Sequence, residues 1–254
     1  MPPDPWFNTS ENNTLMAVCT RKLIKNIGIG GIIWGIINIA IGVFAIQDSQ
    51  INAGILIIGV MMLGTGVQAL RRPSLGVLLT ETIVTVLLIL WNVFITVVNL
   101  LAGETFDLRG LIFPVIVAIV IGNQYRKLGH LRALIEAVEP KTIEATKNVC
   151  KTIVKKKVKE EPLILQTTDR KCRAQLMDDR VFFIQRDLLR AFIAPKEAVR
   201  GAIAKPEAKT WAVVFNHPLG KIEYGFDKKN TEKLRNWLAA VVSPPAPPPP
   251  TQSV

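Results

Sequence analysis

Three long apolar segments constrain the fold of this chain more than any other feature of its sequence. They span residues 26–46, 51–70 and 75–101, and each is close to the length of about 20 residues that a helix needs to cross a bilayer. A fourth segment, 108–125, has a shorter apolar run interrupted by Pro114, and it reaches this length only if Arg109 extends toward the headgroups. We therefore predict a membrane bundle of four transmembrane helices.

The charge is distributed unevenly along the chain. A formal net charge of +11 accompanies a mean hydropathy of +0.31, which is unusual for one soluble globule because a strong positive excess repels itself in a compact fold. Most lysines follow residue 122, whereas the long apolar runs precede it. We therefore divide the chain into a cytoplasmic N-terminal segment (1–25), a transmembrane domain (26–125), a basic helical linker (126–162), a β-rich domain (163–242) and a Pro-rich disordered tail (243–254).

Basic residues on alternate flanks of the apolar segments predict the orientation. The flanks in question carry Arg21, Lys22, Lys25, Arg71, Arg72, Arg126, Lys127 and Arg132, whereas the opposite loops carry Asp48, Glu104 and Asp107 against Arg109. Cytoplasmic loops are enriched in lysine and arginine. This pattern predicts a multi-pass protein of the plasma membrane with both termini in the cytoplasm.

Small and polar residues recur on single faces of the predicted helices. Helix-packing positions on the first are Gly28, Gly31, Gly35 and Gly42, and a polar face on the third consists of Glu81, Thr85, Asn92, Thr96 and Asn99. Small residues allow helices to approach closely, and polar residues form hydrogen bonds between them. The pattern favours the interior of a tight bundle. An alternative is a small transporter or channel component that uses the polar face around Glu81, because an ionisable group inside a membrane often marks an ion path.

A lysine-rich helix is expected at 141–159, after a cytosolic continuation of the fourth span. Its basic positions are Lys147, Lys151, Lys155, Lys156, Lys157 and Lys159, and its apolar residues lie mostly on one side. Such a helix can lie on an anionic leaflet, where each lysine contributes about 1 kcal/mol. Equally, the lysines can belong to a solvated helix and only reinforce the orientation.

After Pro162 the apolar period changes from that of a helix to that of a strand. The segments "KCRAQLM", "KTWAVVFN" and "KIEYGFD" alternate apolar and polar residues. A turn at Asp178-Asp179 precedes a further expected strand, "RVFFIQR", and "HPLG" forms the turn between the last two. "NTEKLRNWLAAVV" then has the spacing of an amphipathic helix. We expect an α+β domain whose core includes Trp211, Phe215, Tyr224, Phe226, Leu234 and Trp237.

Residues 163–242 resemble a bacterial-type pleckstrin-homology-like (PH-like) module, on the pattern "WAVVFN...GKIEYGF" followed by "TEKLRNWL". The resemblance implies a small antiparallel β sandwich or open barrel capped by the C-terminal helix, and a role in binding lipid headgroups or a protein partner. In members that bind phosphoinositides, basic residues cluster on the first hairpin. Here Arg170, Lys171 and Arg173 occupy a comparable place, surrounded by acidic residues.

No sequence motif predicts catalysis, a metal or a cofactor. Phosphate-binding glycine loops, nucleophile elbows and metalloprotease motifs are missing, and the three cysteines have neither a close pair nor the spacing of a zinc site. The lysines lie close to the predicted membrane and accompany no RNA-binding aromatic motif, so nucleic acid is not an expected partner. We expect a membrane anchor or scaffold rather than an enzyme, which binds membrane lipids and a protein partner of unknown identity. Self-association into a homo-oligomer stays open.

Overall fold

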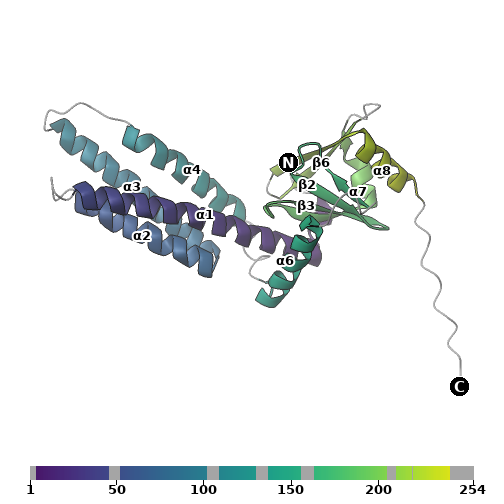
Figure 1. Ribbon diagram of the computed structural model, residues 1–254, viewed down its shortest axis with the longest axis horizontal. Helices are drawn as coiled ribbons and strands as arrows, with labels where there is room; N and C mark the ends of the chain where they lie inside the picture. The colour runs from purple at the N-terminus through teal and green to yellow at the C-terminus, as the bar shows by residue number, and fades with distance from the viewer. Residues whose placement is uncertain are drawn as a thin grey trace, which may run out of the picture. The chain divides into compact units, whose positions relative to one another are not determined.

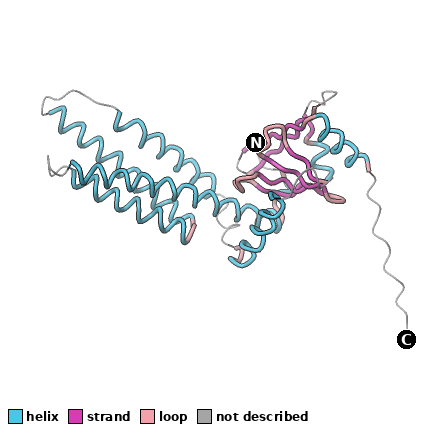
Figure 2. Tube along the Cα trace, in the orientation of Figure 1, coloured by secondary structure: helices cyan, strands magenta, loops and turns pink. Residues whose placement is uncertain are grey.

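The computed structural model describes residues 4–45, 52–101, 109–129, 137–155, 163–204, 210–218 and 220–240. The chain divides into two compact units, one of Met1–Leu15 with Ala145–Val254 and one of Met16–Glu144, and each is described separately. Figure 1 labels the main helices and some of the strands, and the strands coloured in Figure 2 all belong to the first unit. The predicted Pro-rich tail and the linker lysines Lys156, Lys157 and Lys159 lie outside the described residues.

The membrane unit is built from helices α1 (Ser10–Ala45), α2 (Asn52–Arg71), α3 (Leu75–Leu101) and α4 (Arg109–Gly129). Among the residues that the structure describes, three stretches are long and apolar enough to cross a membrane: Ser10–Phe44, Ala53–Arg71 and Leu75–Leu101. These confirm the prediction of a membrane protein. The predicted fourth span is not confirmed, since α4 begins with Arg109 and continues past its apolar run into polar residues such as Asn123.

The outward surfaces of these helices are suited to lipid. Large apolar side chains are exposed along them, including Ile33 and Ile36 on α1, Ile57 on α2 and Phe94 on α3. A soluble protein rarely leaves contiguous apolar surface of this kind in water. Exposure of these side chains to lipid has no hydrophobic cost. The burial pattern therefore agrees with the composition of the three long helices.

The β domain consists of two antiparallel sheets and a C-terminal helix, which confirms the predicted sheet domain. One sheet has the order β1-β2-β3-β4, with β1 (Ile164–Gln166), β2 (Cys172–Leu176), β3 (Arg180–Gln185) and β4 (Ala191–Pro195). The other has the order β5-β6-β7, with β5 (Ile203–Ala204), β6 (Trp211–His217) and β7 (Gly220–Phe226). Helix α7 (Lys196–Gly201) joins the sheets, and α8 (Lys228–Ala239) follows them.

Stacked aromatic rings fill the core between the sheets. Phe183 stacks on Tyr224 and Phe192 at centroid distances of 5.2 and 5.1 Å, and Phe215 meets Phe183 edge to face at 5.3 Å. Such pairs contribute about 0.5–1.5 kcal/mol each beyond the burial of their area. Of the expected core residues, the following are buried: Phe215, Tyr224, Phe226 and Leu234; Trp211 and Trp237 pack at its margin, partly buried.

Both ends of α8 have polar partners from the domain. Asp227 precedes the helix, and its carboxylate accepts the Asn230 N–H at 2.8 Å. At the other end, Lys196 and Arg200 of α7 donate to the carbonyls of Ala240 and Leu238. Cations at a helix C-terminus satisfy its free carbonyls and complement its dipole. These contacts place α8 against α7.

The N-terminal residues belong to the β domain. Met1–Leu15 cluster with Ala145–Val254, although we expected 1–25 to be a separate segment. A short 3-10 helix, η1 (Pro5–Phe7), packs against β4, and Phe7 is only 3% exposed within the aromatic core. Residue Ser10 then begins α1, which continues without a break into the membrane unit.

Candidate functional site

The pairing of β2 with β3 places basic residues from two hairpins next to each other. Cys172 lies opposite Gln185, and the Arg186 N–H donates to the Lys171 carbonyl at 2.8 Å. Arg170, Lys171 and Arg186 are all exposed. The register therefore brings Arg186 next to the adjacent pair Arg170 and Lys171 at one end of the first sheet.

Arg173 connects this end of the sheet to helix α6 (Pro140–Lys155). The side chain is 8% exposed, and Nη1 donates to the Ile153 carbonyl at 3.0 Å. That carbonyl belongs to the last described turn of α6, so the arginine attaches strand β2 to this helix. Burial, together with the nearby charge of Arg186, lowers the pKa of the Arg173 guanidinium. We expected Arg173 on an open strand face, but α6 contacts this face.

Helix α6 carries lysines on either side of Ile153 in the sequence. Lys151 and Lys155 are exposed and flank Ile153 along the helix, while Lys147 is half-buried. The apolar residues Ile143, Cys150 and Ile153 are buried within the protein. We define the basic face as the exposed cations of α6 and of the two turns that Arg173 connects to it: Lys151, Lys155, Arg170, Lys171 and Arg186.

Two acidic residues close the hairpins of the basic face. Asp169 accepts the Thr167 hydroxyl at 2.6 Å and the Lys171 N–H at 3.0 Å, and these bonds lower the pKa of its carboxyl. Asp187 accepts the Leu189 N–H at 3.0 Å in the neighbouring turn. Each carboxylate therefore shapes its own turn, and the cations outnumber the two acids.

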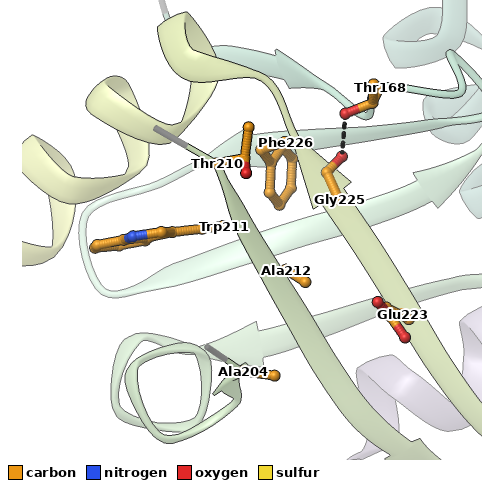
Figure 3. Close-up of a pocket in the computed structure, with 8 residues that line it drawn as sticks. All are labelled: Thr168, Ala204, Thr210, Trp211, Ala212, Glu223, Gly225 and Phe226. Carbon is orange, nitrogen blue, oxygen red and sulfur yellow. Dashed lines mark hydrogen bonds between the residues drawn. The ribbon is translucent and has the colours of Figure 1, made fainter. Parts of the chain in front are cut away.

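A separate hollow of about 470 Å³ lies on the β5-β6-β7 sheet (Figure 3). Its lining is Thr168, Ala204, Thr210, Trp211, Ala212, Glu223, Gly225 and Phe226. The Thr168 hydroxyl donates to the Gly225 carbonyl at 3.2 Å and ties the β1-β2 turn to β7 along its rim. The charged group of this lining is the exposed carboxylate of Glu223, so the hollow does not suit an anionic headgroup.

In the membrane unit, the predicted glycine face is the contact between α1 and α2. Gly28, Gly31, Gly35 and Gly42 are all buried. A Cβ added to Gly35 would lie 2.6 Å from the Leu63 nitrogen and 2.8 Å from the Gly59 carbonyl oxygen. Gly28 and Gly42 face Ala69 and Leu56 of α2 in the same way. The two backbones therefore touch along a stripe with a spacing of seven residues.

Gly31 instead makes room for the carboxylate of Glu81. This side chain of α3 is 2% exposed, contacts Gly31 of α1 and accepts the hydroxyl of Thr65 from α2. Glu81 therefore joins three helices. Within the described part of the chain, no lysine, arginine or histidine lies within ion-pair distance of it.

The rest of the predicted polar face does not gather around Glu81. Thr85 is buried one turn away, but its hydroxyl donates to the Glu81 backbone carbonyl at 2.8 Å. Asn92 and Thr96 also bond to carbonyls one turn earlier on α3, and Asn99 is half-buried. These side chains satisfy their polarity within their own helix, so the structure describes an isolated carboxylate rather than a chain of polar groups.

The buried histidine His217 and the buried cysteines Cys150 and Cys172 are poorly suited to acid–base or nucleophilic chemistry. Burial lowers the pKa of His217 to about 3, and burial raises the pKa values of the Cys150 and Cys172 thiols to about 11 and about 12. At neutral pH the imidazole is uncharged and both thiols are protonated, whereas the thiolate is the reactive form of cysteine. Across the described ranges, no three His, Cys, Asp or Glu side chains form a group that could hold a metal ion.

Comparison with protein-family models, curated proteins and solved structures gives no match for this chain.

Proposed function

We propose that this protein is a membrane anchor with four spans, whose cytoplasmic PH-like domain presents the basic face to the anionic inner leaflet and there binds lipid headgroups or a protein partner. The observation that carries the proposal is the bond from Arg173 to the Ile153 carbonyl, since it attaches the lysine-bearing helix α6 to the end of the sheet that carries both basic turns. Lysine and arginine near an anionic leaflet contribute about 1 kcal/mol each.

The packing of the N-terminus supports the number of spans. Residues 4–15 and 163–240 fold together in one unit, so both lie on the same side of the membrane. The chain between them must then cross an even number of times. Three apolar helices alone would give an odd number of crossings, and a crossing by α4 makes the number even. With 21 residues at 1.5 Å each, α4 is about 31 Å long, sufficient for a hydrocarbon core of ~30 Å.

The two antiparallel sheets followed by α8 support the PH-like assignment, because they match the sandwich with a C-terminal helix that the sequence resemblance implied. Fold alone does not determine function. The lipid-binding part of the proposal therefore depends on the basic face.

Amine labelling tests both the orientation and the basic face. In sealed vesicles, a reagent that cannot cross membranes should modify Lys171, Lys228 and Lys229 only from the cytoplasmic side, because the proposal places the whole β domain there. Modified lysines are identified by mass spectrometry. Modification of Lys228 from the external side would overturn the proposed orientation.

The second step uses the full chain in nanodiscs of anionic or zwitterionic lipid. Anionic lipid should slow acylation of Lys151, Lys155 and Lys171 about fivefold, the factor that corresponds to 1 kcal/mol per residue. High salt should remove the difference. The exposed lysines Lys228 and Lys229 on α8 are internal controls and should react equally in both lipids. Equal rates at all five lysines would refute the lipid role.

A second candidate function is transport of a proton or a small cation through the membrane unit. The observation in its favour is Glu81, a carboxylate buried between three helices with a hydroxyl as its hydrogen-bond partner. Intramembrane acids of this kind commonly belong to ion or proton pathways.

If this candidate is correct, Glu81→Gln should abolish a flux that the wild-type protein shows in reconstituted vesicles, because glutamine keeps the hydrogen bond but carries no ionisable group. Thr80→Val on the exposed side of the same helix is the matched control and should leave the flux unchanged. Absence of flux from wild-type protein across a panel of cations would count against transport.

A further inference from the structure

Residues 4–12 lie across an open seam between the two sheets of the β domain. Strand β4 is the last strand of its sheet, so one of its edges has no strand partner. In the other sheet, β5 pairs with Val213 and Ala212 of β6 and leaves the far end of β6 uncovered. An uncovered edge presents backbone donors and acceptors that need partners.

Asp4 completes the edge of β6. Its N–H donates to the Asn216 carbonyl at 3.1 Å, and its carboxylate accepts the Asn216 N–H at 3.3 Å and the Asn216 side-chain amide at 3.4 Å. One residue thereby satisfies both backbone groups at this position. This is the bonding that an added strand would supply.

Asn12 completes the edge of β4 with its side chain. Its amide oxygen accepts the Ile193 N–H at 2.7 Å, and its amide nitrogen donates to the Ile193 carbonyl at 3.0 Å. Asn12 is 3% exposed, so these bonds are shielded from water. The pair of contacts again resembles one step of a strand ladder.

Two aromatic rings enter the core between these edges. Trp6 stacks on Phe7 at 3.9 Å and meets Phe215 edge to face at 5.5 Å. Phe7 lies 5.2 Å from Phe192 and 5.0 Å from His217, between centroids. The depressed pKa of His217 keeps the imidazole neutral, so this pocket is an apolar one for an aromatic side chain.

We propose that the seam between β4 and β6 is a peptide-binding groove for a segment whose aromatic pair lies in a 3-10 turn, and that the N-terminus of this chain occupies it in cis. The contacts define the ligand chemistry. It requires an acidic residue two positions before the aromatic pair and an amide side chain five positions after it, as Asp4, Trp6, Phe7 and Asn12 provide. The groove is distinct from the basic face, so either proposal can fail alone.

The test is binding of a peptide of residues 4–12 to full-length protein in detergent. The recipient is a variant in which Asp4, Trp6, Phe7 and Asn12 are all replaced by alanine, and the probe carries fluorine on the phenylalanine for NMR titration. We expect saturable binding with a Kd of about 1–10 μM. Wild-type protein should bind at least about a hundredfold more weakly, because its tethered segment competes at an effective concentration of about 1 mM.

Controls separate specific binding from loss of the fold. A peptide of scrambled sequence should not bind the variant. If the variant is folded, as judged by resistance of 163–240 to trypsin, and the peptide does not bind, the proposal is overturned. If the variant is unfolded alone, the peptide must restore trypsin resistance, and failure to do so would overturn the proposal equally. The same affinity for wild type and variant would also contradict it.

Discussion

Replacing Gly35 by leucine should separate α1 from α2 and produce the largest loss of stability in the membrane unit. Backbone atoms of Leu63 and Gly59 lie 2.6 and 2.8 Å from where the first added carbon would be. Neither can move without its helix. Overpacking a core typically costs about 1–3 kcal/mol, and leucine brings three further carbons to a contact that has no room for one. We expect a loss of at least about 3 kcal/mol.

The measurement is unfolding of the purified chain by a denaturing detergent, followed by far-ultraviolet circular dichroism. Gly30→Leu is the matched control, because no heavy atom lies within 4 Å of an added Cβ at that position on the same helix. It should leave the free energy of unfolding unchanged or raise it by up to about 1 kcal/mol, because leucine has a higher helix propensity than glycine. An equal loss for both substitutions would mean that the contact with α2 does not determine the result.

The glycine stripe was predictable from the sequence because helical geometry alone places residues seven apart on one face. The same rule put Gly31 into the stripe, yet this residue faces Glu81 of α3. A single helix shows which residues share a face, but it does not show which of two neighbouring helices each residue meets. That division depends on how α1, α2 and α3 pack together, which periodicity does not contain.

Three strands of the β domain, β2, β6 and β7, were predictable because apolar and polar residues alternate along them. Strand β3 has four consecutive buried residues, and it was predictable only from the turn at Asp178-Asp179 before it. Strand β4, the short apolar run "AFIAP", has neither signal. The alternation in β2 also gave a wrong expectation for one residue. It suggested that the Arg173 side chain is exposed to solvent, but α6 supplies a carbonyl that permits its burial.

The role of the N-terminus was not predictable from local pattern. Asp4 and Asn216 are separated by 212 positions, and η1 is too short to have a periodicity. The available signal was the aromatic pair Trp6-Phe7 within an otherwise polar stretch. Such a pair is costly to expose, so its presence next to a predicted membrane helix could have indicated burial against another part of the chain.

Phe7→Ala should destabilise the β domain by about 3–5 kcal/mol, the usual cost of removing a buried phenylalanine. The ring is 3% exposed and contacts Phe192 and His217, which belong to different sheets. Its removal leaves a cavity at the seam and weakens the attachment of Asp4 and Asn12 on either side. The effect is large because one side chain supports contacts of both sheets.

The Phe7→Ala effect can be measured as urea-dependent labelling of Cys172, a thiol that is 2% exposed in β2 and reacts only when the domain opens. The full chain in mild detergent should show a lower urea midpoint of labelling for the variant.

Leu163→Ala, at a side chain that is 54% exposed, should shift the free energy of opening by less than about 0.5 kcal/mol. Glu11→Ala removes the exposed ion pair with Arg180 and should cost at most about 1 kcal/mol. A loss for Phe7→Ala no greater than that for Glu11→Ala would show that the β domain is stable without its N-terminal segment, and the shared-side argument for an even number of spans would lose its support.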